Sequence, residues 1–403
     1  NNSILVTTLK HGLFVLKPTG IFPFASQQKS LFQNERIYSA AKINQNHLAI
    51  ATSNGGLYIL NIAGDIIQTF SKREGLQNNN ILSVFTDHQK NLWLGMDTGI
   101  DFVAYDSAIK QINPFLLDAS GYTAMVYQNK LWLGTSNGLY NVALQNLNDI
   151  SFTKGNFTTV NNTKGQTWGL AKINNQLLLG HHEGAFILQN NQAKQLAGNS
   201  GFWNFIARST TKPSNEIIAG TYGGLAVFNT SKGLPQFQEE IPGFKESSRF
   251  LTTDSEGRIW VSHPYHGVYK IEKNKSGKYT SKSYGKKEGL PSNVNNHVYK
   301  INNEIVIATE AGIYQYQAAK DQFNTAQYYN NLLGNKSIRY LKEDDYGNIW
   351  FIQEKAIGVI DKSGAKPQVL YFPELTNKLL SGFELIYPIN LQNIILSGEK
   401  GFF

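Results

Sequence analysis

The sequence contains no cysteine among its 403 residues. This absence excludes disulfide scaffolds, thiolate nucleophiles and cysteine-ligated metals, although a chain with 41% hydrophobic residues can pack a large core without cross-links. A long apolar run is missing as well, because no stretch reaches the roughly 18 residues that a membrane-spanning helix needs. Since the sequence both opens and ends on strand-like residues, we expect it to be a fragment whose targeting and membrane segments lie outside it.

Charge and catalytic motifs are also sparse. Charged residues make up 16% of the chain, and the net charge of +8 is spread without any run of lysine or arginine. Such a distribution does not predict contact with nucleic acid. The nucleophile elbow, the phosphate-binding loop and the HExxH zinc motif are all absent. We therefore predict that the protein is not an enzyme and uses no cofactor.

What the sequence does have is a short pattern of strands and turns, clearest between Glu74 and Val103. Ile81–Asp87, Leu92–Gly95 and Ile100–Val103 are β-branched or apolar segments that predict three strands. A polar turn separates the first two, and Gly99 permits a tight turn before the third. A three-stranded meander cannot bury its faces alone, so we expect further sheets to stack on it.

The pattern LWLG-x-x-x-G recurs ten times, at intervals of about 43 residues. The glycine that closes each copy stands at Gly12, Gly56, Gly99, Gly138, Gly184, Gly224, Gly267, Gly312, Gly358 and Gly401. This period, with about four short strands in each unit, is typical of the blades of a propeller. We therefore predict an all-β protein, a β-propeller with ten repeats folded as four-stranded antiparallel blades. Tryptophans at the second position of the pattern (Trp93, Trp132, Trp260, Trp350) are expected to pack between blades.

The repeats are predicted to form two rings. The segment after Val103 lacks the loop that begins the other repeats and contains Pro114, which suggests a boundary there. Residues 105–403 would then form a complete seven-bladed propeller. Residues 1–104 would be the last three blades of a first, incomplete propeller. The alternative is a single ring of ten blades.

The repeat also resembles a known family. GLQNNNILSVFTDHQKNLWLGMDTGIDFV, ending at Val103, and EGLPSNVNNHVYKINNEIVIATEAGIY, from Glu288 to Tyr314, resemble the two-component regulator propeller repeat of Bacteroidetes sensors. The resemblance implies a periplasmic sensor region of an inner-membrane protein that acts as a homodimer and contacts the membrane only through segments outside this chain. Its output would be a LuxR-type helix-turn-helix or a histidine kinase. A small molecule or an oligosaccharide would be the ligand.

Candidate binding residues follow from the geometry of a propeller. The loop that enters the innermost strand of each blade and the turn between its second and third strands open on one face, so a central ligand site would use both. At the start of the innermost strand, repeats four to ten align Thr123, Trp168, Asn204, Arg249, His297, Arg339 and Glu384, and Trp203 precedes Asn204. The turns add His181, Tyr222, His263, Tyr265 and His266.

Guanidinium groups bind carboxylates in a bidentate manner and aromatic rings stack on sugars, so these residues suit a carboxylate or sugar-acid ligand. The alternative is a water-filled channel whose mouth is polar only for solvation. His181, His182 and Glu183 suggest a metal, but neighbouring residues on a turn point apart, and we predict no metal site. Two further alternatives are a cell-envelope scaffold that binds other proteins and a propeller lyase or glycosidase.

Overall fold

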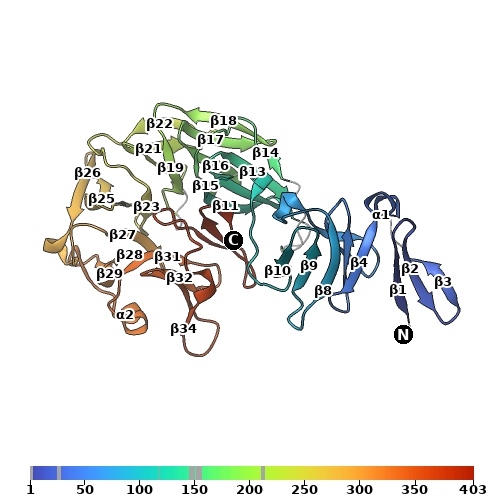
Figure 1. Ribbon diagram of the computed structural model, residues 1–403. Helices are drawn as coiled ribbons and strands as arrows, with labels where there is room; N and C mark the ends of the chain where they lie inside the picture. Colours follow the sequence, from blue (N-terminus) through green and yellow to red (C-terminus); the bar gives the residue numbers. More distant parts are fainter. Residues whose placement is uncertain (1–2, 25–28, 117, 145–149, 151–156, 210–213) are drawn as a thin grey trace. The chain divides into compact units, whose positions relative to one another are not determined.

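The structure is a computed structural model that describes residues 3–24, 29–116, 118–144, 150, 157–209 and 214–403 (Figure 1). Ten antiparallel β-sheets occupy these residues, one for each repeat, and the strands of each sheet follow one another in chain order. The predicted β-propeller fold is confirmed. Seven of the described sheets have four strands, and the other three have three. No helix in the described ranges is long and apolar enough to cross a membrane.

The chain divides into two compact units, of which the first, Asn1–Lys110, contains three sheets. These sheets consist of β1 (Ile4–Thr8), β2 (Gly12–Lys17) and β3 (Gly20–Pro23); β4 (Ile37–Lys42), β5 (His47–Thr52), β6 (Leu57–Asn61) and β7 (Ile66–Phe70); and β8 (Ile81–Thr86), β9 (Leu92–Met96) and β10 (Ile100–Val103). A short helix and a 3-10 turn connect them: α1 (Lys29–Glu35) and η1 (Lys72–Glu74).

The second unit, Gln111–Ile150 with Asn156–Phe403, contains seven sheets. The first three are β11 (Gly121–Tyr127), β12 (Lys130–Thr135), β13 (Gly138–Ala143) and β14 (Thr158–Thr159); β15 (Thr167–Ile173), β16 (Gln176–His181), β17 (Gly184–Gln189) and β18 (Gln192–Ala197); and β19 (Phe202–Ala207), β20 (Glu216–Thr221), β21 (Gly224–Asn229) and β22 (Gln236–Glu240). The fourth and fifth are β23 (Phe250–Thr253), β24 (Ile259–His263), β25 (Gly267–Lys273) and β26 (Tyr279–Tyr284); and β27 (His297–Ile301), β28 (Glu304–Thr309), β29 (Gly312–Gln317) and β30 (Gln322–Thr325).

The last two sheets are β31 (Ile338–Glu343), β32 (Ile349–Gln353), β33 (Ala356–Asp361) and β34 (Gln368–Tyr371); and β35 (Ile386–Pro388), β36 (Ile394–Gly398) and β37 (Gly401–Phe402). Helical segments of this unit lie between strands: η2 (Pro114–Leu116), η3 (Lys286–Glu288), α2 (Gln327–Leu333) and η4 (Pro373–Leu375). The seventh sheet has three strands of its own, and the chain completes it from the other end of the unit. Ile112 donates its N–H to Phe402 O at 2.7 Å and accepts from Phe402 N at 2.8 Å. This exchange joins the two ends of the second unit.

In nine of the ten repeats the closing glycine lies at the turn between the second and third strands and has a positive φ, whereas Gly358 lies inside β33, paired with Phe351. In the second sheet of this unit, Gly184 pairs with His181 and has φ of +146°, which residues with a side chain rarely adopt. A Cβ at this position would also lie 2.1 Å from the carbonyl oxygen of Ala197 in β18. Both the dihedral angle and the close approach of the backbone therefore restrict the position to glycine.

The tryptophans of the repeat differ in their burial. Trp132 and Trp260 are 5% and 0% exposed, and Trp350 is half-buried with its ring stacked on Phe372. Trp93 in β9 is 45% exposed. The expectation that all four pack between sheets is therefore not met by Trp93 within the first unit, where β4–β7 pack on the opposite face of β8–β10.

Candidate functional site

The end of the second unit at which the innermost strand of each sheet begins is called the mouth below. There Thr167 pairs with His181 and Phe202 pairs with Thr221, so the start of the innermost strand lies beside the turn between the second and third strands. The two groups of predicted residues are thus brought to one face of each sheet. A local irregularity of the backbone determines the direction in which side chains point at this face.

That irregularity is a β-bulge. The pairing of β11, β15, β19 and β31 with the next strand skips one residue each, namely Tyr122, Trp168, Trp203 and Arg339. A bulged residue leaves the ladder, and its side chain is re-aimed. By the same register, the equivalent residues of the other three sheets are Arg249, Asn296 and Glu384. The predicted alignment is therefore one residue out of register in three repeats: Thr123, Asn204 and His297 belong to the ladder row.

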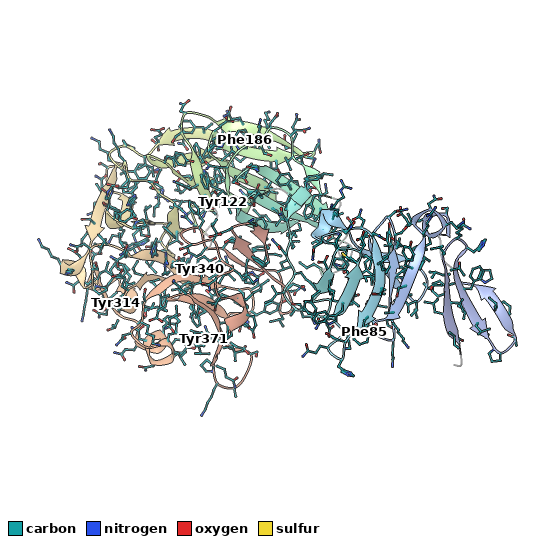
Figure 2. All side chains as sticks on the ribbon, viewed as in Figure 1. Phe85, Tyr122, Phe186, Tyr314, Tyr340 and Tyr371 are labelled. Carbon is teal, nitrogen blue, oxygen red and sulfur yellow. The ribbon has the colours of Figure 1, made fainter. Side chains whose placement is uncertain are left out.

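Trp168 stands at the centre of an aromatic cluster, defined here as Tyr122, Trp168, Trp203, Tyr222 and Phe383. Its ring centroid lies 4.7 Å from that of Tyr122, 4.8 Å from that of Trp203 and 5.4 Å from that of Phe383. The indole N–H of Trp168 donates to the hydroxyl of Tyr222 at 2.7 Å. These side chains come from the first, second, third and seventh sheets, and Figure 2 labels Tyr122 within the unit. The cluster offers flat apolar faces with polar edges, the combination that stacks on a sugar ring.

Arg249 provides a positive charge beside the aromatic cluster. Its guanidinium carbon lies 4.0 Å from the ring centroid of Phe383, and Nη1 donates to Gly382 O at 2.5 Å. Desolvation lowers the pKa of Arg249, although the Glu384 carboxylate opposes this shift. Across the mouth, Arg339 Nη2 lies 3.6 Å from Oε1 of Glu384. Two guanidinium groups thus face the same entrance with one carboxylate between them.

His297 lies under this charged group, with its ring 4.7 Å from that of Phe250. Desolvation lowers the pKa of His297 to about 4, with the nearby arginines contributing in the same direction and Glu384 opposing. Below it, the hydroxyl of Tyr299 donates to Arg339 O at 3.0 Å, and Tyr340 donates to Ile386 O at 3.2 Å. Burial raises the pKa of Tyr340 to about 12. Beside the charged groups there are thus three neutral rings, of which Tyr299 and Tyr340 are hydrogen-bonded through their hydroxyl groups.

The lowered pKa of His297 predicts a loss of stability in acid. The unfolded chain binds a proton at His297 near pH 6.5, whereas the folded chain does so only near pH 4, so stability falls as pH decreases through this window. Allowing for partial solvent screening, His297 accounts for about 2 kcal/mol of this loss. Denaturant unfolding at pH 7 and pH 4.5 should show a smaller pH effect in His297→Gln than in the wild type. His88→Gln, at an exposed turn, is the control and should retain the full effect; an unchanged His297→Gln profile would contradict the assignment.

The remaining predicted residues lie at the turns. His263 and His266 stack with centroids 4.2 Å apart, His266 Nδ1 lies 2.5 Å from Glu246 Oε2, and Tyr265 is 75% exposed. His181 is only 1% exposed, and its ring centroid lies 4.3 Å from that of His182 with the two rings tilted by 48°. The side-chain oxygen of Asn204 accepts from the N–H of Phe205 at 2.8 Å.

Two groups of side chains could hold a metal in the described part of the chain: His181, His182 and Glu183, and Glu246, His263 and His266. In each group three ligand atoms lie within 4.8 Å of one another. However, Nδ1 of His181 accepts from Glu183 N, and Nδ1 of His263 accepts from Tyr265 N. These bonds leave the proton on the other ring nitrogen of each neutral imidazole, which then has no lone pair for a metal. We assign a metal to neither group.

Two residues of the aromatic cluster escape sequence reasoning. Tyr122 precedes the aligned Thr123, and the bulge shows that Tyr122 is the equivalent of Trp168. Phe383 lies in the long connection between β34 and β35, where no repeat pattern exists to align it. A check of the residue before each aligned position would have found Tyr122, but no sequence signal identifies Phe383.

Comparison with known proteins agrees with the architecture. Residues 75–98 match the family model described as Two component regulator propeller, and no curated protein matches the sequence. Among solved structures, the extracellular domain of a B. thetaiotaomicron protein classed as a hybrid two component system, BT3049, is 20% identical with a TM-score of 0.65; the match covers 99% of this chain and 54% of that one. A second such domain, from BT4673 of the same organism, is 18% identical with a TM-score of 0.55 and coverages of 99% and 56%. At these identities the likeness establishes a shared fold, and the chain spans about half the length of either structure.

Proposed function

We propose that this chain, which carries the two-component regulator propeller repeat, is part of the periplasmic sensor region of a membrane-anchored bacterial signalling protein. A ligand bound at the mouth of the second unit would favour one arrangement of a dimer, and further domains would carry the signal to a LuxR-type helix-turn-helix or a histidine kinase. Such a ligand acts only through its difference in affinity for the two arrangements. The similarity to extracellular domains of signalling proteins supports the location and the class.

One observation carries the binding proposal: the bulged row that faces the mouth contains Tyr122, Trp168, Trp203, Arg249 and Arg339. A row needed only for folding would not require two arginines and three large aromatic side chains at a partly exposed position. Placed together, these side chains provide apolar faces for a sugar and guanidinium groups for a carboxylate. The mouth therefore suits an acidic oligosaccharide.

The first unit is proposed to belong to another propeller, completed by sheets outside this sequence. Phe85, Trp93 and Phe102 are 65%, 45% and 51% exposed on one face of β8–β10. In the second unit the equivalent tryptophan of the fourth sheet, Trp260, is fully covered. An apolar sheet face of this kind is normally buried. The solved structures, about twice as long as this chain, have room for the additional sheets.

The binding proposal is tested with a matched pair of ligands, galacturonate trimers and galactose trimers, which differ in their carboxylates. We expect the galacturonate trimer to raise the melting temperature and the galactose trimer to do so less. The double variant Arg249→Ala/Arg339→Ala should weaken galacturonate binding at least about 100-fold, because a hydrogen bond to a charged group contributes about 1.5–3 kcal/mol. Isothermal titration calorimetry measures both affinities.

Arg73→Ala, at an exposed 3-10 turn of the first unit, is the matched arginine control and should bind like the wild type. A folded double variant that still binds like the wild type would show that the mouth is not the binding site. A flat response to a wide panel of oligosaccharides would favour the scaffold alternative instead. Shortened trimers in the mass spectrum after incubation would favour an enzyme.

A further inference from the structure

A segment of the chain itself occupies the mouth of the second unit. Leu380–Glu384 runs between η4 and β35, and its ends are fixed on its own sheet: Leu380 N donates to Ser397 O at 3.3 Å, and the Ser397 hydroxyl donates to Phe383 O at 3.0 Å. The tip of the segment, Ser381 and Gly382, is exposed. This segment is called the plug below.

Contacts of the plug reach across the ring. The ring of Phe383 lies 5.2 Å from that of Tyr122 in the first sheet and stacks on Trp168 in the second at an interplanar angle of 16°. Arg249, at the start of the fourth sheet, donates to Gly382 and covers Phe383. Glu384 approaches Arg339 of the sixth sheet. One short segment of the seventh sheet thus engages residues of four other sheets around the entrance.

The plug occupies the position at Arg249 that an anionic ligand would take. No carboxylate oxygen lies within 4.0 Å of the Arg249 guanidinium nitrogens among the described residues. Its partners are a neutral carbonyl and a phenyl ring from the plug, and the ring of Phe250 at 5.2 Å. A carboxylate would bind the same guanidinium more strongly, with two parallel hydrogen bonds. Phe383 in turn presents to Trp168 the flat apolar face that a sugar ring would present.

The plug is held weakly enough to leave. Residues 381–384 form no strand, and Gly382 has φ of +83° with open space where a Cβ would stand. Among the described residues, its polar and ring contacts with the other sheets are one hydrogen bond, two ring contacts, one cation–π contact and one long ion pair. Contacts of these kinds are individually weak at partly exposed positions.

We propose that the plug is an internal stand-in for the ligand, and that a carboxylate-bearing sugar binds by displacing Gly382 and Phe383 from Arg249 and Trp168. This inference rests on the proposed function of the mouth. It specifies that binding moves the connection between the sixth and seventh sheets and separates Glu384 from Arg339. The ligand signal therefore starts as a displacement of the chain just before β35.

The test uses the galacturonate trimer and the variant Phe383→Ala. If the plug competes with the ligand, the variant binds about tenfold more tightly than the wild type, because the open state becomes more populated. Phe372→Ala is the matched control: Phe372 stacks on Trp350 at 18° in the same connection, yet contacts no residue of the aromatic cluster in the described structure, and this variant should keep the wild-type affinity. Hydrogen exchange at the amides of Gly382 and Phe383 should accelerate when the trimer binds to the wild type.

Equal or weaker binding by Phe383→Ala would overturn the proposal, because Phe383 would then be part of the binding surface or irrelevant to it. Slower exchange at Gly382 and Phe383 with the trimer would overturn it as well, since the ligand would sit over a closed plug. Absence of trimer binding in both proteins also rejects it. The proposed function fails separately, when no member of the wider oligosaccharide panel binds to either the wild type or Phe383→Ala.

Discussion

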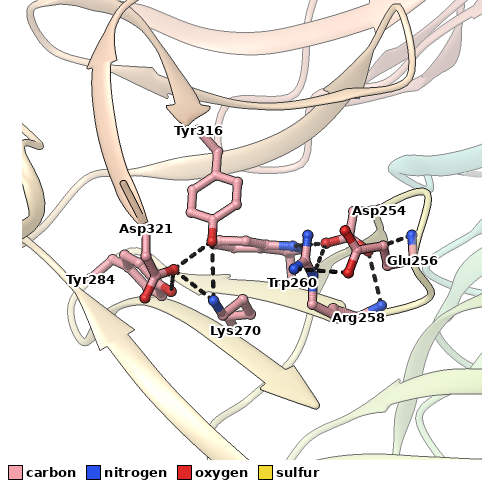
Figure 3. Close-up of polar contacts among 8 residues, drawn as sticks. All are labelled: Asp254, Glu256, Arg258, Trp260, Lys270, Tyr284, Tyr316 and Asp321. Carbon is pink, nitrogen blue, oxygen red and sulfur yellow. Dashed lines mark hydrogen bonds and ion pairs between the residues drawn. The ribbon is translucent and has the colours of Figure 1, made fainter. Parts of the chain in front are cut away.

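Replacing Asp321 by asparagine is expected to lower the free energy of unfolding of the second unit by about 3 kcal/mol. Asp321 accepts hydrogen bonds from Lys270 at 2.6 Å, from Tyr284 at 2.6 Å and from Tyr316 (Figure 3). Lys282 donates to the same carboxylate at 2.5 Å. Lys270 is only 7% exposed, so the substitution leaves its ammonium group buried without a counter-charge. These hydrogen bonds lower the pKa of Asp321, against the effect of desolvation. Denaturant unfolding followed by tryptophan fluorescence measures the loss.

Asp118→Asn is the matched control for this change. Asp118 pairs with Lys400 at 3.5 Å, and the two side chains are 80% and 68% exposed. A pair of this kind contributes little, so the control should lose less than about 0.5 kcal/mol. Equal effects of the two substitutions would contradict the claim that burial of Lys270 makes the Asp321 cluster important. Adding Lys270→Met to Asp321→Asn should restore part of the lost stability, because the unpaired charge is then removed.

The Asp321 cluster shows why part of the energetics could not be predicted. Lys270 and Tyr284 belong to the fourth sheet, whereas Tyr316 and Asp321 belong to the fifth. Asp321 stands in the turn before an outer strand, where the repeats share no pattern. The period of the repeats predicts that two sheets pack face to face, but it does not reveal which polar residues meet between them. The packing of Trp260 was predictable, since it occupies the repeated position itself.

The candidate site was predictable in kind but not in detail. Propeller geometry alone indicates which end of each repeat faces the mouth, and this brought Trp168, Arg249 and Arg339 into the prediction. The bulges moved the row by one residue in three repeats, since a bulge changes the register without changing the residue types. Phe383 could not be predicted, because it lies in the long connection between β34 and β35, where there is no repeat pattern to align.

The contacts that close the ring could not be predicted from the repeat pattern either. The segment around Ile112 lacks the motif of the repeats, and it was used only to mark a boundary. In the structure it provides the outer edge of the seventh sheet, and Gly401 N also donates to Ala119 O at 2.8 Å. Tyr387 of β35 accepts from Val126 N of β11 at 3.0 Å, which joins the first and seventh sheets a second time. Both contacts link residues far apart in the chain, which a local pattern cannot identify.

Phe402→Ala is expected to cost about 4 kcal/mol, because it removes a large side chain from the place where the ring closes. Phe402 is 0% exposed and packs in one core with Leu133 of the first sheet and Ile395 of the seventh. Its backbone also holds Ile112, so the cavity weakens the only segment that completes the seventh sheet in the described structure.

In Phe402→Ala, the contact between the first and seventh sheets should unfold locally before the whole unit unfolds. Hydrogen exchange of Phe402→Ala should therefore accelerate in β11 and β36 more than in β24, which lies in the fourth sheet. Phe237→Ala is the control, since Phe237 is 44% exposed on the outer strand β22 and should lose less than about 1 kcal/mol. Similar losses for the two variants, or acceleration spread evenly over all seven sheets, would show that the contacts of Phe402 do not close the ring. We expect the contact between the first and seventh sheets to be the least stable part of the ring. A displacement of the chain just before β35 would act on the same seventh sheet.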